Sequence, residues 1–140
     1  DILVRFPGED AMCTGDLIVE YSTLYFQSAN PERWIQNLRE IATGPGKFIL
    51  PGHGDICPHS QAAAVADYLT VLLRSAKKFL EPFKTAFIDP IETPEIDKMA
   101  GDFLAGGSPD AREINEKAGP ENAQRELRMM FRNLMNRRLR

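Results

Sequence analysis

The first apolar runs of the chain predict a β-hairpin. Residues 2–6 are rich in β-branched and aromatic side chains, and the turn formers of residues 7–10 separate them from a second apolar run, residues 11–14. We expect Gly15 to end the second strand and Asp16 to lie at its exit. The hairpin would therefore present an acidic side chain at the end of a strand.

The following segments change from no clear period to a helical pattern and then to an extended one. Residues 17–28 are apolar without a period, which predicts a partly ordered loop. Asn30-Pro31 favours a helix start, because Asn is a good N-cap and Pro is tolerated in the first turn. We expect this helix to end at residues 44–46 and a strand to cover residues 47–50. The apolar face of the helix is predicted to consist of Trp34, Ile35, Leu38 and Ile41.

Helical patterns dominate the rest of the chain. The longest covers residues 61–80, with Ser60 as its expected cap, and a shorter one covers residues 93–104. A linker of Gly, Ser and Pro at residues 105–109 and a final helix from Gly119-Pro120 onwards complete the chain. The apolar stripe of the longest helix is Val65, Tyr68, Leu69, Leu72, Leu73, Ala76, Phe79 and Leu80, and that of the last helix is Leu127, Met130, Phe131, Leu134 and Met135. Strand, helix and strand in succession predict a layered α/β fold.

Composition limits the classes of partner. The 140 residues carry a net charge of −3, which does not indicate a nucleic-acid partner, and no apolar run is long enough to span a membrane. Residues 121–140 hold six Arg and two Glu. A solvated face is the favoured interpretation of these arginines, a docking or homodimer helix the next, and RNA binding a distant third. No secretory signal is present in the sequence, and the compartment stays unknown between cytoplasm and periplasm.

Two side chains with metal-binding chemistry follow the two predicted strands. Asp16 follows Thr14-Gly15, and His53 lies between two glycines in Pro51-Gly52-His53-Gly54. These glycines allow unusual backbone angles and clear space around the imidazole. Carboxylate and imidazole both bind zinc, but zinc takes about four ligands, so two do not complete a site. The other histidine, His59, could be a ligand, a substrate contact or the residue that precedes a helix, and the last is favoured.

This order of elements resembles the C-terminal half of the metallo-β-lactamase superfamily. The resemblance covers residues 1–81 and rests on the strand ending in Thr14-Gly15-Asp16, a helix containing Trp34, the Pro51-Gly52-His53-Gly54 segment and the long amphipathic helix. It implies the second half of an αββα sandwich, in which Asp16 bridges two metal ions and His53 binds the second. Zinc is the implied metal, with iron or manganese as alternatives. Residues 1–87 would form that half and residues 88–140 a helical extension.

The chain departs from the superfamily in a way that shapes the functional hypothesis. The His-x-His-x-Asp-His motif and the later His ligand are absent, and the sequence has only two histidines. Since the chain also lacks an initiator Met, we expect it to be a fragment whose missing N-terminal half supplies the other ligands. The complete protein is expected to be a hydrolase that uses a metal-activated water on a small ester, thioester, lactone or lactam-type substrate. The chain alone is expected to be inactive and to bind zinc weakly.

Several further roles stay open at this stage. Asp55 and Thr14 are expected to support the two ligands, on proximity in sequence only. Residues 21–26 could line a pocket, although plain core is the better interpretation. Cys13 and Cys57 are not a disulfide framework, and small buried thiols are favoured over a bridge between them. The alternative to the enzyme hypothesis is a non-catalytic relative that serves as a binding or dimerisation module.

Overall fold

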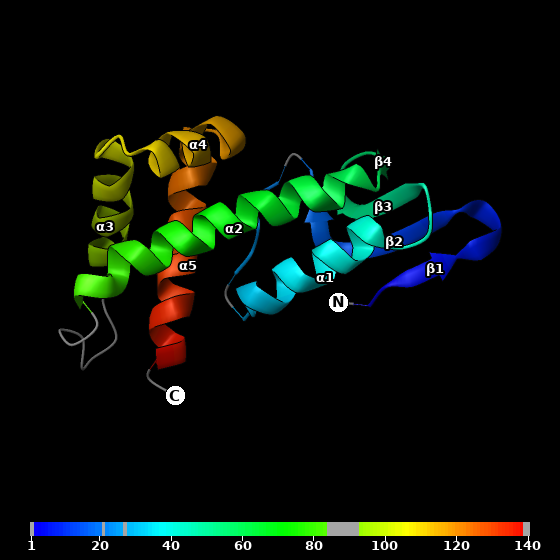
Figure 1. Cartoon of the computed structure of the whole chain (residues 1–140). Coiled ribbons are helices and arrows are strands. Elements are labelled where there is room, and N and C mark those ends of the chain that lie inside the picture. The colour runs from blue at the N-terminus through cyan, green and yellow to red at the C-terminus, as the bar shows by residue number, and fades with distance from the viewer. Residues whose placement is uncertain (1, 21, 27, 84–92, 139–140) are drawn as a thin grey trace. The chain divides into compact units, whose positions relative to one another are not determined.

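The computed structural model is an α/β structure that describes residues 2–20, 22–26, 28–83 and 93–138 (Figure 1). Its strands form one mixed sheet in the order β1-β2-β3-β4, in which β2 and β3 run parallel and the other neighbours antiparallel. The elements are β1 (Val4–Phe6), a 3-10 helix (Pro7–Glu9), β2 (Ala11–Val19), α1 (Pro31–Thr43), β3 (Phe48–His53), β4 (Cys57–Pro58), α2 (Ser60–Leu80), a second 3-10 helix (Glu81–Phe83), α3 (Thr93–Ala105), α4 (Pro109–Ala118) and α5 (Pro120–Arg138). The predicted α/β class is confirmed.

The chain divides into two units. Unit 1 comprises the described residues up to Leu24 together with Asn30–Leu69, and unit 2 comprises the described residues of 25–29 and 70–140. Helix α2 therefore contributes residues to both units. The predicted domain boundary after residue 87 lies outside the described residues. None of the described helices combines the length and the apolarity needed to cross a lipid bilayer.

The predicted hairpin is confirmed, but its second strand is longer than expected. Strand β2 continues to Val19 instead of ending at Gly15, so residues 17–19 are strand and not loop. Gly15 has a φ of +53°, a left-handed conformation that glycine adopts at little cost. The glycine therefore shifts the register of the strand where the sequence suggested a stop.

Helix α1 begins and ends where the sequence predicts. The Asn30 side chain accepts a hydrogen bond from the Arg33 backbone N–H at 3.1 Å, and Pro31 is the first helical residue. The helix buries Trp34, Leu38 and Ile41, whereas Ile35 is half-buried. Strand β3 then runs through His53, so the histidine ends the strand and does not stand on the loop after it. The Glu20 backbone N–H donates to the His53 carbonyl at 2.9 Å and keeps this end of β3 paired.

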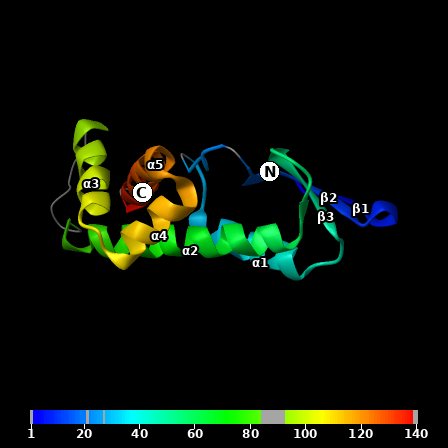
Figure 2. The same ribbon diagram turned by 90° about the horizontal axis from the view of Figure 1, so that it is seen from above.

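The two faces of the sheet in unit 1 differ sharply. Figures 1 and 2 show α1 and the first part of α2 on the same side of the sheet, where Met12, Ile49 and Cys57 are buried as direct neighbours across β2, β3 and β4. The residues that the register places on the opposite face include Val4, Phe6, Cys13, Phe48 and Leu50. Of these, Val4, Phe6 and Phe48 are 44%, 42% and 50% exposed. One face of the sheet is thus apolar and open to solvent.

We expect this open face to make the isolated chain self-associate, because contiguous exposed apolar surface is removed from water by contact with another copy. The double variant Phe6→Ser/Phe48→Ser should weaken association by about tenfold or more, since each buried phenylalanine contributes roughly 1.5 to 3 kcal/mol. Sedimentation velocity over a range of concentrations measures this. Ile56→Ser removes an exposed apolar side chain outside the strands and is the control. A wild-type chain that stays monomeric at high concentration would contradict the prediction.

Unit 2 has a core of its own. The apolar stripe predicted for the last helix is buried in α5, as expected. The Phe79 ring of α2 stacks on Phe131 of α5 with 5.3 Å between centroids and meets Phe103 of α3 edge-on at 5.6 Å. Arg125, Arg132 and Arg137 of α5 are exposed, consistent with the solvated face favoured from the sequence. Helix α4 was not predicted.

Buried polar groups join the elements of unit 2. Ser75 of α2 donates a hydrogen bond to Asp110 of α4 at 2.9 Å, and this bond, with help from the nearby Arg74 guanidinium, lowers the pKa of Asp110. Asn133 of α5 is 5% exposed, and its side-chain amide donates to the carbonyls of Phe26 at 2.7 Å and Ala29 at 2.9 Å. Phe26 and Ala29 are therefore held against α5 by these two hydrogen bonds.

Candidate metal centre

Asp16 and His53, the two metal ligands expected from the sequence, lie side by side in unit 1. The distance between Asp16 Oδ1 and His53 Nε2 is 3.7 Å, and the two side chains are 65% and 64% exposed. Asp16 projects from β2 and His53 ends the neighbouring parallel strand β3. The chain thus brings a carboxylate and an imidazole together at a solvent-accessible edge of the sheet.

A bulge in β2 sets the position of Asp16. Gly15 pairs with Pro51 and Val19 with His53, so three residues of β2 stand against the single residue Gly52 of β3. Proline has no N–H to donate, which weakens the regular ladder at this point. Bulges of this kind redirect side chains and are frequent beside functional sites. Here the bulge turns the Asp16 carboxylate toward the end of β3.

The two glycines beside His53 have separate structural roles. A Cβ on Gly52 would lie 2.2 Å from Asp16 Oδ1, so only glycine lets the carboxylate approach this strand. Gly54 has a φ of +104°, and a Cβ there would lie 2.5 Å from the Glu20 Cβ. The expected unusual backbone angle is confirmed for Gly54 alone, and the space that the two glycines clear is occupied by Asp16 and Glu20, not by the imidazole.

The geometry of the pair fits one shared metal ion. With zinc bonds of about 2.0 to 2.2 Å to oxygen and nitrogen, tetrahedral coordination places two ligand atoms about 3.4 Å apart. The observed 3.7 Å differs by a few tenths of an ångström. Among the described residues, however, no group of three or more His, Cys, Asp or Glu side chains could hold a metal ion. The described residues therefore present two side chains of metal-binding type at a suitable spacing, and not a complete site.

Asp55 and Thr14 do not support the pair in the way the sequence suggested. Asp55 is exposed, and none of the interactions found among the described residues involves its side chain. Thr14 is fully buried, and its hydroxyl donates to the carbonyl of Gly15 at 3.3 Å. Adjacency in sequence misleads here because the left-handed Gly15 and the register shift beside it separate Thr14 from Asp16, and Asp55 lies beyond the end of β3.

His59 lies at the other end of β3 from His53. Its backbone N–H donates a hydrogen bond to the carbonyl of Lys47, the residue before β3. His59 directly precedes α2, as favoured from the sequence. The His59 Nε2 is buried and has no hydrogen-bond partner in the part of the chain that the structure describes. A Cβ placed on Gly46 would lie 2.9 Å from this nitrogen. This histidine is packed against the backbone and does not join the Asp16–His53 pair.

The two cysteines are free thiols. By register, Cys57 shares the helix-covered face with Ile49, whereas Cys13 shares the open face with Leu50, so a bridge between them would have to pass through the sheet. Burial raises the pKa of Cys57, and the Glu20 carboxylate raises it further. Cys57 is accordingly a neutral space-filling thiol, which confirms the favoured interpretation for this residue, whereas Cys13 is only half-buried.

Part of the stretch 22–26 belongs to the core. Leu24 and Phe26 are buried, whereas Tyr25 is 61% exposed. Tyr21 lies outside the described residues. The interpretation of this stretch as core, favoured over a pocket lining, is confirmed for Leu24 and Phe26.

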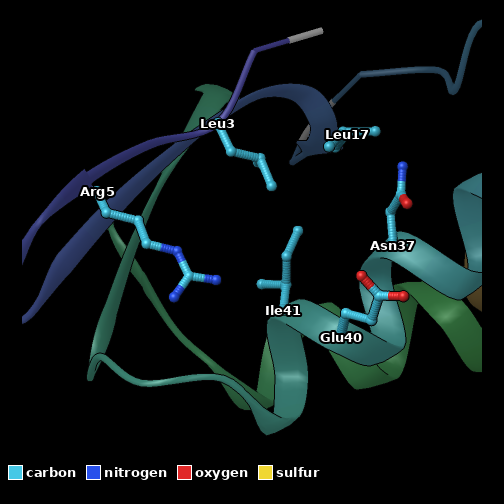
Figure 3. Close-up of a pocket in the computed structure, with 6 residues that line it drawn as sticks. All are labelled: Leu3, Arg5, Leu17, Asn37, Glu40 and Ile41. Atoms are coloured by element: carbon cyan, nitrogen blue, oxygen red, sulfur yellow. The ribbon is translucent and has the colours of Figure 1, made fainter.

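One contact beside the site has no signal in the sequence. The Trp34 indole N–H of α1 donates to the carbonyl of Leu17, the residue after Asp16, at 2.9 Å. Leu17 also borders a cavity of about 200 Å³ between the hairpin and α1 (Figure 3). The other residues around the cavity are Leu3, Arg5, Asn37, Glu40 and Ile41. Neither Asp16 nor His53 lines it, so this cavity is separate from the candidate centre.

Comparison with known proteins adds no assignment: neither a protein-family model, nor a curated protein, nor a solved structure matched the chain.

Proposed function

We propose that this chain is the C-terminal part of a zinc-dependent hydrolase of the metallo-β-lactamase type. The observation that carries the proposal is the Asp16–His53 pair, with 3.7 Å between carboxylate oxygen and imidazole nitrogen. Two side chains of metal-binding type from neighbouring strands, with a glycine that clears the approach of the carboxylate, support a metal site. The substrate class is a small ester, thioester, lactone or lactam.

The residues of the chain have separate roles in this proposal. Asp16, in the bulge of β2, and His53, at the end of β3, would hold the metal ions, with Asp16 shared between the two ions and His53 a ligand of the second. Zinc ions supply an activated water at neutral pH and stabilise the negative charge that develops on the substrate oxygen. Glu20 pairs its backbone N–H with the His53 carbonyl and so fixes the strand end that presents the imidazole.

The remaining ligands have to come from polypeptide outside these 140 residues, since the sequence contains two histidines and one of them, His59, is packed elsewhere. The open sheet face of unit 1 supports the same proposal. A second layer of the complete protein would cover Val4, Phe6 and Phe48 and remove their exposed surface from water. For the isolated chain we expect weak zinc binding and negligible hydrolysis, because two ligands alone hold an ion poorly.

The second candidate is a binding or dimerisation module without catalytic activity. The open apolar sheet face is the observation that favours it, because exposed patches of this kind mark interaction surfaces. A module of this kind would fold and associate without metal and would be indifferent to His53→Ala.

Sequencing the coding DNA upstream of the codon for Asp1 separates the two candidates. The hydrolase proposal expects the same reading frame to encode His-x-His-x-Asp-His followed by one more histidine. Those residues would complete the ligand set that Asp16 and His53 begin. An upstream frame without these histidines contradicts the hydrolase and leaves the binding module.

A further inference from the structure

We propose that Trp34 is a positioning residue for Asp16: its indole N–H holds the Leu17 carbonyl and thereby fixes the bulged strand from which the carboxylate projects. The inference rests on the function proposed above, since it gives Asp16 its role. The hydrogen bond between Trp34 and Leu17 is not itself part of the proposed hydrolase mechanism. The contact lies within unit 1 and joins α1 to β2.

The bulge creates the need for such a contact. Asp16, Leu17 and Ile18 stand between two register pairs and face only Gly52 on β3, so the parallel partner does not hold each of them in register. Asp16 is also largely exposed and gains little from packing. A strand segment with an interrupted ladder needs another anchor if its side chain is to keep one direction.

Trp34 supplies that anchor from a rigid support. The residue is 8% exposed and stands in the first turns of α1, whose start is fixed by the Asn30 cap. The donor and acceptor are 2.9 Å apart, which is an ordinary length for a strong N–H···O bond. A buried indole normally has one hydrogen-bond acceptor for its N–H. Here the acceptor is the carbonyl of Leu17, the residue after Asp16.

Packing alone would hold Leu17 less firmly than a core residue. Its side chain borders the cavity of about 200 Å³ together with Leu3 and Ile41, as Figure 3 shows. A side chain that faces a cavity has fewer contacts on that side than one in a filled core. The fully buried Ile18 side chain anchors the end of the bulge, and the backbone hydrogen bond from Trp34 holds Leu17, the residue between it and Asp16.

The test compares Trp34→Phe with Leu38→Val in the 140-residue chain. Trp34→Phe removes the N–H and keeps an aromatic ring, whereas Leu38→Val trims the buried face of the same helix without touching the Leu17 carbonyl. The urea concentration at the midpoint of unfolding is measured for both variants, to establish that they lose a similar amount of stability. Amide NMR signals of Asp16 and Ile18 report the order of the bulge, and a titration with Co²⁺ alone reports binding through broadening of the His53 signals.

We expect Trp34→Phe to broaden the Asp16 and Ile18 signals by exchange and to weaken apparent Co²⁺ binding by about tenfold, the lower range for residues that orient metal ligands. Leu38→Val should change neither. Wild-type signals and affinity in Trp34→Phe would overturn the inference. If Co²⁺ binding by the wild-type chain is insensitive to Asp16→Asn, the proposed metal site fails, and the amide signals still decide whether Trp34 orders the bulge.

Discussion

Replacing Asp16 or His53 with alanine is expected to remove bound zinc and hydrolytic activity together from the complete protein proposed above. Each change deletes one ligand from the pair that is 3.7 Å apart. Loss of a residue that merely orients a ligand costs about 10- to 100-fold in metal affinity or activity, so loss of a ligand should lower kcat/KM by at least about 100-fold. Zinc content by mass spectrometry and kcat/KM measured on the same preparations test this.

The neighbouring carboxylate Asp55 provides the matched control. It lies two residues after His53, is exposed and makes none of the contacts found among the described residues. Asp55→Asn should keep both zinc and activity within a factor of about two, because an isolated surface carboxylate contributes little. A His53→Ala protein that retains its zinc and most of its turnover would show that the pair is not part of the catalytic centre.

The same two variants should hardly affect folding, which separates a ligand role from a structural one. Both side chains are more than half exposed, and a pair of exposed polar side chains contributes at most about 1 kcal/mol. Urea unfolding of the 140-residue chain with Asp16→Ala should therefore stay close to wild type. Activity lost through a missing ligand can in this way be distinguished from activity lost through unfolding.

Local signals in the sequence were enough to predict those elements whose ends are set by short-range chemistry. The Asn30 cap and the Pro31 start placed α1 correctly because both act within one turn of the helix. The hairpin at the N-terminus followed from two apolar runs around a turn. The stripe of α5 followed from helical periodicity alone.

The errors have equally local causes. Helix α4 starts with Ser108 as its cap and Pro109 as its first residue, which is a helix-start signal that resembled a linker because Gly106 and Gly107 precede it. The sequence predicts too early an end for strand β2, because glycine at position 15 is typical of a strand end. In the structure, its left-handed conformation makes a bulge and the strand continues.

The sequence predicted which two residues could form the site but not what holds them. Asp16 and His53 follow apolar runs, and parallel neighbours β2 and β3 bring such positions to one edge of the sheet. The bond from Trp34 to Leu17 joins residues that are 17 positions apart, and no periodicity or motif encodes it. Contacts of this type depend on tertiary packing and become visible only in the structure.

Gly52→Ala is expected to disrupt the fold and the site at once. The new Cβ would lie 2.8 Å from the Gly15 carbonyl carbon and 2.9 Å from the Asp16 backbone nitrogen, in addition to 2.2 Å from Asp16 Oδ1. A flexible carboxylate could rotate away, but the two backbone atoms can move only if β2 and β3 separate. Forced overpacking of this kind typically costs about 1 to 3 kcal/mol, and the backbone contacts place this variant at the upper end. Urea unfolding of the 140-residue chain measures it.

Two comparisons isolate the cause of the Gly52→Ala effect. Gly8→Ala is the matched control, because a Cβ there meets nothing within 4 Å, and its stability should change by less than about 0.5 kcal/mol. Adding Asp16→Ala to Gly52→Ala relieves only the contact with the carboxylate, so the double variant should stay destabilised. Full recovery in the double variant would mean that the carboxylate alone needs the space. A Gly52→Ala chain as stable as wild type would show that β2 and β3 do not approach each other as closely as the structure places them.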